Sequence, residues 1–281
     1  MKHDILMITH RRPDFTRLSL ARLLDTCDET MKVWVWHNGN DAATLAIVRE
    51  LSSHRHFHTL HVSDENRALR TPTNWFWNES TADFLSKVDD DCLMPYGWGE
   101  RLRAAHIAAP QIGLNACWHY YTDDIVDEFE HLKLRKVGDT HLYVHGFVQG
   151  SGYVMKRKVY DDLGPIRQSE SFSTYGLRAA VRGWLNGWHH PLCFMDHMDD
   201  PRSPHYPFKS EEQFRHSPSL SKEAFGIRSL SDAIAFSRHQ ARRLQLEIIE
   251  PRNHFGIRGI LRKLRQRLPQ REATEQPKNA Y

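Results

Sequence analysis

Apolar runs alternate with helical patterns through the first third of the chain. Short β-type segments occupy residues 4–9, 31–41, 57–64 and 84–88. Between the first two, Leu20, Leu23 and Leu24 recur at helical spacing. Strands that alternate with helices of about a dozen residues are typical of βαβ units. The pattern therefore predicts an α/β fold of Rossmann-like topology, with a mostly parallel sheet flanked by helices.

The second half has a less regular pattern. It predicts a helix over residues 100–109, a strand over 113–121 and a loop or hairpin over 122–140. Residues 141–164 are expected to form a strand, a glycine turn, a second strand and a helix that ends at Gly164. A helix from Ser173 to about Gly187 and a strand over 190–200 follow. Residues 201–219 are rich in Pro, Ser and His, and a further helix is expected over 229–248. We expect an irregular helical C-terminal extension.

The last part of the chain has a different composition. A helical pattern near its end carries apolar residues on one face and basic residues on the others: Ile257, Ile260, Leu261, Leu264 and Leu268 against Arg258, Arg262, Lys263, Arg265 and Arg267. Such a helix can lie on an anionic membrane, so we expect peripheral membrane contact through residues 256–268. A terminal helix packed on the domain and a disordered basic tail are the alternatives.

These patterns divide the chain into three parts. Residues 1–200 form the main domain, with a first half over 1–95 and a second half over 96–200. Residues 201–250 form the extension that packs on this domain, and residues 251–281 form the basic helix and tail.

Composition narrows the class of protein. With 40% hydrophobic and 26% charged residues, the chain is typical of a soluble globular protein. Its formal net charge of +3 is too small to suggest a nucleic-acid partner. The four cysteines have no paired spacing, and neither a signal peptide nor an apolar run long enough to span a membrane is evident. We therefore expect a cytoplasmic protein, or one peripheral on the cytoplasmic face of a membrane.

Polar clusters follow each of the four predicted strands of the first half. They are Thr9–Arg12, His37–Asp41, Asn66–Arg67 and Asp89–Asp91. In parallel sheets, ligands bind at the carboxyl ends of the strands, so these clusters are expected to meet in one site. Three consecutive aspartates suit a hard divalent cation, which prefers oxygen ligands. Taken alone, the same triplet is equally compatible with a solvated acidic turn.

The order of these motifs adds specificity. The matching positions are Thr9, Arg12 and Pro13 after the first strand; Asn38, Gly39, Asp41 and Thr44 after the second; Asn66, Arg67 and Asn74; Asp89 and Asp91; the segment 150–166; Arg182, Gly187 and Trp188; and His197 in the segment 196–200. In this order they resemble the motifs of family 2 glycosyltransferases, which have the GT-A fold. The resemblance spans residues 4–200 and implies that the first half binds a nucleotide sugar and the second half an acceptor.

The resemblance also implies roles for individual residues. Together with the position of Arg11 after the first strand, it assigns the donor site to Thr9, Arg11, Arg12, Asn38, Asp41, Arg67, Asn74 and Asp89. A Mn²⁺ or Mg²⁺ ion would be held by Asp89, Asp91 and His197, with Asp91 the most direct ligand. Asp90 is the least needed of the triplet. His37 and Asn38 replace the usual acidic pair. The resemblance therefore does not identify the base of the nucleotide, which can be uracil, thymine or guanine.

The catalytic base is the main departure from the family pattern. Tyr175 and Gly176 stand where inverting members carry an acidic pair that deprotonates the acceptor hydroxyl. Glu170, one loop upstream, is the first candidate replacement, and Asp196 and Asp123 are the others. A retaining mechanism, which needs no base at this position, is the alternative to an inverting one.

Aromatic and polar residues of the second half are candidates for acceptor binding. Trp118 and Tyr120 follow a predicted strand on the acceptor side and could stack on a sugar ring, although core packing would also account for them. Gln149 and Gly150 lie at the glycine turn that the resemblance places beside the acceptor.

Three functions are compatible with these features. The leading hypothesis is a metal-dependent, inverting glycosyltransferase that moves a sugar from a nucleoside diphosphate to a glycan or lipid-linked acceptor, in the synthesis of cell-surface polysaccharide or glycoconjugates. A degenerate GT-A protein that binds glycans or acts as a scaffold would explain the missing acidic pair. A nucleotidyltransferase is disfavoured, because the loop after the first strand, residues 9–15, contains no glycine.

Overall fold

The computed structural model describes residues 1–216 and 225–267, and the side chains of its last helix as far as Arg262. Its first half alternates strands and helices: β1 (His3–Thr9), α1 (Pro13–Asp25), β2 (Met31–Asn38), α2 (Ala42–Leu51), β3 (Phe57–Ser63), α3 (Arg70–Glu79) and β4 (Phe84–Asp89). The four strands are parallel and lie in the order β3-β2-β1-β4. The predicted βαβ arrangement is confirmed.

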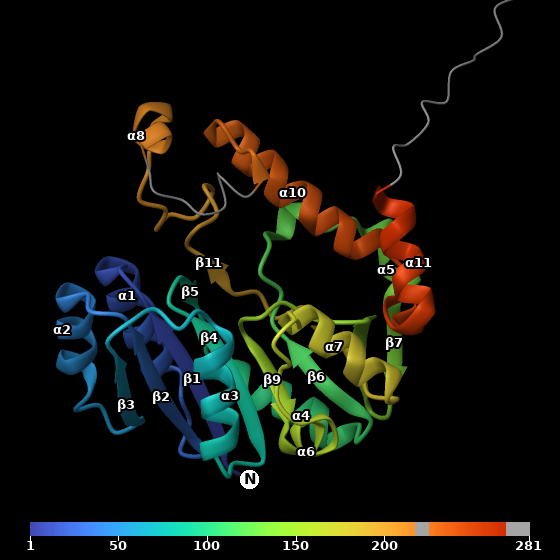
Figure 1. The fold of residues 1–281 in the computed structure, drawn as a ribbon, viewed down its shortest axis with the longest axis horizontal. Coiled ribbons are helices and arrows are strands. Elements are labelled where there is room, and N and C mark those ends of the chain that lie inside the picture. Colours follow the sequence, from blue (N-terminus) through green and yellow to red (C-terminus); the bar gives the residue numbers. More distant parts are fainter. Residues whose placement is uncertain (217–224, 268–281) are drawn as a thin grey trace, which may run out of the picture.

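The second half extends the same sheet. Its elements are β5 (Cys92–Leu93), α4 (Trp98–Ala108), β6 (Ile112–Ala116), the 3₁₀ turns η1 (Thr122–Asp124) and η2 (Asp127–Phe129), α5 (Glu130–Lys133), β7 (Leu134–Val137), β8 (Thr140–His145), β9 (Tyr153–Lys156), α6 (Arg157–Leu163), α7 (Phe172–Val181), β10 (Leu185–His190) and β11 (Asp196–His197). The nine-stranded sheet continues from β4 in the order β9-β6-β10-β8-β7. Because only β9 and β8 run against the other strands, the sheet is mostly parallel, and Figure 1 shows helices on both of its faces.

The two faces of the sheet are buried against different helices. Along β1, Ile5 and Met7 belong to the core cluster beneath α1, whereas Leu6 and Ile8 belong to the cluster that contains Phe76 of α3. Both faces of β1 are therefore apolar, as is typical of a central parallel strand, and the polar residues are confined to the strand ends. This confinement places the candidate site at the carboxyl edge of the sheet.

The prediction of a helix from Ser173 to Gly187 is wrong in its second part. Helix α7 ends at Val181, Gly183 adopts a φ of +96°, and the chain then enters β10. Strand β10 pairs with β6 on one side and β8 on the other, and Trp188 is fully buried. A Cβ on Gly187 would lie 2.3 Å from the Tyr143 carbonyl oxygen, so this glycine permits close strand pairing and does not end a helix.

Two predicted strands are shorter than expected. The strand predicted over 113–121 ends at Ala116, and that predicted over 190–200 is reduced to Asp196–His197. In both segments the apolar residues beyond the strand pack in the core from irregular backbone; Trp118 and Met198, for example, have no exposed area. Buried apolar character alone did not distinguish such loops from strands.

The extension contains α8 (Glu211–His216) and α10 (Leu230–Leu246), and the segment after it contains η3 (Pro251–His254) and α11 (Gly256–Arg267). Figure 1 shows α8 and α10 above the carboxyl edge of the sheet and α11 beside α5 and β7. The extension is tied to the domain at Asp124, whose fully buried carboxylate accepts from both terminal nitrogens of Arg202 at 2.7 and 2.8 Å. Gln245 adds hydrogen bonds to the Asp124 carbonyl and the Val126 amide.

The structure contains part of the helix that was predicted to contact a membrane. Among the described residues, no helix is both long and apolar enough to cross a bilayer. The expected helix near the C-terminus is present as α11, with Ile257, Ile260 and Leu261 exposed. Leu268 and the rest of the expected tail lie outside the described residues.

Candidate active site

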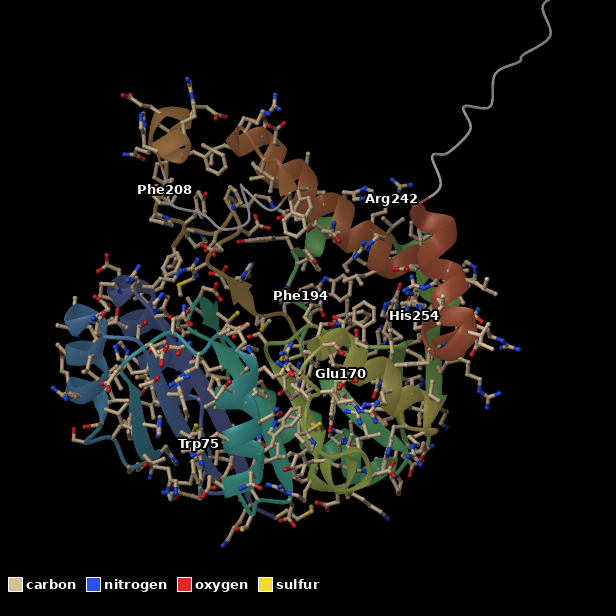
Figure 2. All side chains as sticks on the ribbon, viewed as in Figure 1. Trp75, Glu170, Phe194, Phe208, Arg242 and His254 are labelled. Carbon is tan, nitrogen blue, oxygen red and sulfur yellow. The ribbon has the colours of Figure 1, made fainter. Side chains whose placement is uncertain are left out.

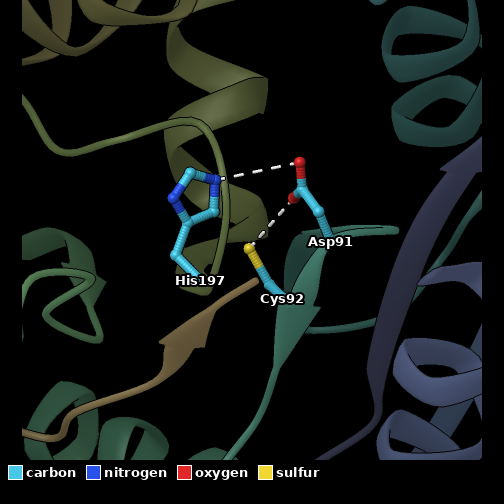
Figure 3. A group of neighbouring side chains, drawn as sticks. All are labelled: Asp91, Cys92 and His197. Carbon is cyan, nitrogen blue, oxygen red and sulfur yellow. Dashed lines mark hydrogen bonds and ion pairs between the residues drawn. The ribbon is translucent and has the colours of Figure 1, made fainter. Parts of the chain in front are cut away.

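Three segments that are distant in the sequence meet at the carboxyl edge of the sheet. Arg12 follows β1, Asp91 follows β4, and His197 lies on β11, which pairs antiparallel with β5 and so brings His197 opposite Cys92. Arg12 donates to the Asp91 carboxylate at 2.7 Å and to the Asp199 carboxylate at 2.6 Å. The Nε2 atom of His197 lies 3.8 Å from the same Asp91 oxygen that Arg12 contacts, Oδ2 (Figure 3).

The pairing between Asp91 and His197 dominates the electrostatics of this cluster. Burial opposes ionisation of Asp91, but the adjacent His197 and Arg12 lower the pKa of its carboxyl group. Burial likewise disfavours a charged His197, yet the Asp91 carboxylate raises the pKa of the imidazole to about 9. At neutral pH the two side chains therefore form an ion pair, and a metal ion that binds His197 must displace its proton.

The donor atoms of this cluster fit a divalent cation. Ligand atoms of Asp91, Cys92 and His197 lie within 4.8 Å of one another. Carboxylate oxygen and imidazole nitrogen suit Mn²⁺ or Mg²⁺ better than a thiol does. Burial and the neighbouring Asp91 raise the pKa of the Cys92 thiol well above its usual value, so it stays protonated. Asp91 and His197 are thus the two residues best suited to hold a metal.

Asp89, which the sequence predicts to be a metal ligand, is not a member of this ligand group. Its carboxylate is paired with the ammonium of Lys87, and its backbone amide donates to Ser151 Oγ at 2.9 Å. Because Lys87 is itself buried, the charge of Asp89 is largely neutralised within the sheet. With its side chain about one-third exposed, at 32%, Asp89 is available for a donor contact.

Asp90, predicted to be the least needed aspartate, has a structural role. It is buried, and its carboxylate accepts from the His10 amide and from Thr16 Oγ1, both at 3.3 Å. Its carbonyl accepts from Ser19 Oγ at 2.9 Å. Burial and the adjacent Asp91 raise the pKa of the Asp90 carboxyl to about 8. Asp90 therefore attaches α1 to the loop that carries Asp91.

We expect Asp90→Ala to destabilise the protein. The substitution leaves the Thr16 hydroxyl and the His10 amide without an acceptor in a buried position, which costs on the order of 1–3 kcal/mol. Urea unfolding measures the loss. The control is Asp25→Ala on the exposed end of α1, expected to change stability by less than about 0.5 kcal/mol. Equal unfolding midpoints for the two variants would show that Asp90 is dispensable.

The predicted donor residues occupy one edge of the sheet but differ in what they can contact. Asn38 accepts from the Arg67 amide at 2.7 Å and donates to Asn66 and to the Ala68 carbonyl. It therefore shapes the loop after β3. The Arg67 guanidinium is exposed and pairs with Glu65. Arg11 is exposed and has a φ of 51°, the left-handed region that non-glycine residues seldom occupy.

Three predicted donor contacts have other partners in the structure. Thr9 is fully buried and bonds to His37 Nδ1 at 3.1 Å, so it supports the site from below. Asp41 caps α2 by accepting from the Thr44 amide at 3.0 Å. Both ends of the Asn74 side-chain amide bond to the backbone of Ile166, at 2.9 Å each. The prediction that Thr9 and Asn74 contact the donor is therefore corrected: both residues support the surrounding structure. Asp41 is partly exposed and stays a predicted donor contact.

The candidate base Glu170 is committed to a buried ion pair. Its carboxylate oxygens accept from Arg178 Nε and Nη2, both at 2.9 Å, and one also accepts from the Arg167 amide at 3.0 Å. Glu170, labelled in Figure 2, has 6% of its surface exposed. Because every oxygen is occupied and the residue is buried, the prediction that Glu170 is the base is not supported by the structure.

Asp196 lies much closer to the cluster. It precedes His197 on β11, and its carboxylate accepts from Tyr121 Oη at 3.3 Å and Ser203 Oγ at 3.1 Å. Its side chain is half-buried. Of the two residues predicted to be catalytic, Asp196 is the one on the strand that carries His197. The third alternative, Asp123, lies in the surface turn η1.

The predicted acceptor residues divide into buried and accessible ones. Trp118 has no exposed area and packs edge-on against Trp188 at 4.9 Å between ring centroids, so it cannot stack on a sugar. Gln149 accepts from Trp188 Nε1 at 2.6 Å. Tyr120 is half-buried and lines a cavity of about 120 Å³ together with His197. A Cβ at Gly150 would meet only ordinary contacts, so no crowding requires glycine there.

Sequence reasoning missed His119 and Asp199. The His119 ring stacks on His197 at 5.0 Å with an interplanar angle of 10°, and its Nδ1 atom has no partner among the described residues. Burial and the neighbouring His197 lower the pKa of His119 to about 3, so its ring is neutral. Asp199 holds the second branch of Arg12. The only sequence signal was proximity, since Asp199 lies two residues after His197.

Solved structures with the same fold are glycosyltransferases. A mannosyltransferase from Pyrobaculum calidifontis, PcManGT, in complex with GDP-Man and Mn²⁺, aligns over 94% of this chain and 79% of its own with a TM-score of 0.59 and 14% identity. Residues 1–349 of S. aureus TarS align over 95% of this chain and 92% of their own, with a TM-score of 0.54 and 12% identity. GalNAc-T7 with UDP, GalNAc and Mn²⁺ aligns over 70% of this chain and 44% of its own, with a TM-score of 0.53 and 11% identity.

The fold is of the GT-A type. The family model of glycosyl transferase family 2 matches residues 4–164, and the chain belongs to this family. No curated protein sequence matches it. The resemblance of the ordered motifs to this family is thereby confirmed, and the chain is a glycosyltransferase.

Proposed function

We propose that this glycosyltransferase is metal-dependent and inverting, and that it moves a sugar from a nucleoside diphosphate to a glycan or lipid-linked acceptor in the synthesis of cell-surface polysaccharide or glycoconjugates. The observation that carries the proposal is the convergence of Arg12, Asp91 and His197 at the carboxyl edge of the sheet. PcManGT with GDP-Man and Mn²⁺ and GalNAc-T7 with UDP and Mn²⁺ share the fold and support a donor and a metal of these kinds.

The chain's own residues would bind the donor and stabilise the leaving group. Asp91 and His197 would hold a Mn²⁺ or Mg²⁺ ion, which supplies Lewis-acid stabilisation of the charge on the departing diphosphate. Arg12 places a permanent positive charge at the same edge and can donate hydrogen bonds to phosphate oxygens. The exposed Arg11 and Arg67 add further positive charge near the donor.

The acceptor would enter beside β11. Asp196 is our candidate for the general base, because it directly precedes His197 on β11 and its half-buried carboxylate is oriented by Tyr121 and Ser203. Tyr120, which is half-buried, lines the adjoining cavity and can contact an acceptor sugar. The configuration of the product, measured by NMR at the new anomeric centre, tests the inverting mechanism directly.

We expect Mn²⁺ together with one nucleoside diphosphate to raise the melting temperature. A panel of UDP, GDP and dTDP, each with and without Mn²⁺, should identify one diphosphate that stabilises the protein by about 2–4 kcal/mol at 100 to 1,000 times its Kd. Chelation of the metal should remove most of this gain. If none of the diphosphates stabilises the protein in the presence of Mn²⁺, the proposed donor chemistry is wrong.

One observation favours a second candidate, a degenerate protein that binds glycans without transfer. The carboxylate expected as base, that of Glu170, is occupied by Arg178. Slow hydrolysis of the donor sugar in the absence of acceptor would support the enzyme, because this reaction needs the leaving-group machinery but no acceptor. Glycan binding with no donor hydrolysis would support the degenerate protein.

We also propose peripheral membrane contact through α11. Ile257, Ile260 and Leu261 are 76, 60 and 50% exposed, and Arg258 and Arg262 lie on the same helix. The sequence adds Lys263, Arg265 and Arg267. Apolar and basic residues together suit an anionic membrane surface.

Replacing both Ile257 and Ile260 with aspartate should weaken binding to anionic vesicles. The loss of two inserted side chains and the added negative charge should lower the partition coefficient by a factor on the order of 100. Vesicle sedimentation measures it. Ile107→Asp, at an exposed apolar position on α4, is the control and should leave binding unchanged. Equal binding of both variants would exclude α11 as the contact.

A further inference from the structure

A second polar cluster lies away from the candidate active site. Lys133, at the end of α5, is 4% exposed, and His145, at the end of β8, is 5% exposed. The Lys133 ammonium lies 2.8 Å from His145 Nδ1 and also donates to the Leu244 carbonyl in the last turn of α10. In the register of the sheet His145 pairs with Asn186 near the amino end of β10, whereas Arg12 and Asp91 follow the carboxyl ends of β1 and β4.

Both side chains line a cavity of about 320 Å³. Its walls are mainly apolar, from Val144, Trp184 and Ile249 among others, and Arg135 and Glu247 also line it. This volume is several times the roughly 30 Å³ that one water molecule occupies in the liquid. The cavity can therefore hold a small ligand beside Lys133 and His145.

The hydrogen bonding of the pair leaves donors without acceptors. Burial lowers the pKa of Lys133 to about 8, so the amine is still mostly protonated at neutral pH and has three N–H groups. The ammonium can only donate, so His145 Nδ1 must accept and the imidazole proton is on Nε2. The buried Nε2 atom has no partner among residues 1–216 and 225–267. One N–H of Lys133 and the Nε2–H of His145 are thus donors without an acceptor among the described residues.

The charge of Lys133 is also incompletely balanced. No carboxylate lies within ion-pair distance of its ammonium in the described parts of the chain; Glu247 acts only at longer range and pairs weakly with Arg243 at 4.0 Å. The contact with the Leu244 carbonyl stabilises the end of α10, and this accounts for one of the three donors. A buried charge without a counter-charge is costly, and an anion in the cavity would offset this cost.

We propose that this cavity is a binding site for a phosphate group, held by Lys133 and the Nε2–H of His145. Phosphate oxygens can accept from both donors, and the guanidinium of Arg135 adds positive charge. The group can come from a free phosphorylated molecule or from a lipid headgroup. Ile248, 76% exposed, lines the same cavity, and η3 leads from it to α11, so the site is continuous with the surface proposed to contact a membrane.

The first experiment is thermal unfolding of the full chain in inorganic phosphate, with sodium chloride at matched ionic strength as reference. We expect phosphate to raise the melting temperature of the wild type by a few degrees and Lys133→Met to lose this rise. Methionine keeps the length of the side chain, and replacing a buried charge by an apolar group is often neutral or stabilising. Lys136→Met, at an exposed lysine on the adjoining strand β7, is the matched control and should respond like the wild type.

A phosphate-dependent rise of equal size in Lys133→Met and Lys136→Met would overturn the proposal, since it would place the phosphate elsewhere. If Lys133→Met fails to fold, His145→Phe, which keeps an aromatic ring in place, must lose the rise instead. Stabilisation by Mn²⁺ and a nucleoside diphosphate should be unchanged in either variant. A failure here is therefore distinguishable from a failure of the proposed donor site.

Vesicles distinguish the two sources of the phosphate group. Vesicles of phosphatidylcholine with phosphatidic acid carry a phosphomonoester, and vesicles with phosphatidylserine do not. If Lys133→Met loses a preference for phosphatidic acid, the ligand is a lipid headgroup. If it loses the response to inorganic phosphate and binds both vesicles like Lys136→Met, the ligand is a free phosphorylated molecule. If Lys133→Met keeps both the preference for phosphatidic acid and the response to inorganic phosphate, the proposal is wrong.

Discussion

Asp91→Ala should reduce sugar transfer by a factor on the order of 10³ or more. Asp91 is the acidic member of the ligand pair with His197, and it also holds one branch of Arg12. The substitution therefore removes the proposed carboxylate ligand of the metal and frees the guanidinium of Arg12, which we propose contacts the donor phosphates. The measurement is the rate of donor-dependent transfer at saturating Mn²⁺, together with the Mn²⁺ concentration needed for half-maximal activity.

The control for Asp91→Ala is Asp139→Ala, at an exposed aspartate in the turn between β7 and β8. It should retain full activity. Unfolding of both variants in urea separates loss of function from loss of structure, because Asp91 is an ionised, paired group whose removal also affects stability. Transfer at the wild-type rate by folded Asp91→Ala would exclude this cluster as the catalytic centre.

Glu170→Ala should unfold far more easily than the wild type and yet keep its catalytic rate per folded molecule. Removing one partner of the buried Glu170–Arg178 pair leaves the guanidinium uncompensated and costs about 3–5 kcal/mol. Denaturant unfolding measures the loss of stability, and turnover measured well below the melting temperature and normalised to folded protein measures the activity.

Glu170→Gln distinguishes a structural carboxylate from a general base. Glutamine keeps the shape and an acceptor for Arg178, so it should lose less stability than alanine. A base cannot be replaced by an amide, so loss of turnover in a stably folded Glu170→Gln would restore Glu170 as the base. Asp196→Asn, beside His197, is the companion variant, and there we expect turnover to fall with little change in unfolding.

The first half of the fold was predictable because its signals are local. Strands β1 to β4 are short β-type segments, helical patterns separate them, and Asp89–Asp91 lie at the carboxyl end of β4. Strand β10 was not predictable in the same way. Its residues 185–190 include Gly187 and two histidines, and they form a strand because β6 and β8 lie on either side of them. Tertiary pairing thus overrides a weak local preference.

The candidate site shows the same limit. The ordered motifs located Asp91 and His197, which the structure brings together. The sequence did not reveal that Asp90 is buried under α1, that Trp118 is enclosed by other aromatic rings, or that Glu170 faces Arg178 from the next helix. Each of these errors concerns what a side chain packs against, and such contacts depend on residues far along the chain.

The short ladder between β5 and β11 joins two segments that are synthesised at different times, and this determines when the site can assemble. Strands β1 to β4 and Asp91 are synthesised about a hundred residues before His197 on β11 and Asp199 just after it. N-terminal segments generally start to fold first during synthesis. Until β11 arrives, Asp91 lacks the histidine that neutralises it and Arg12 lacks its second carboxylate. The nascent chain can thus pair strands β1 to β4 early, while the cluster of Arg12, Asp91, His197 and Asp199 is completed only after residue 199 has left the ribosome.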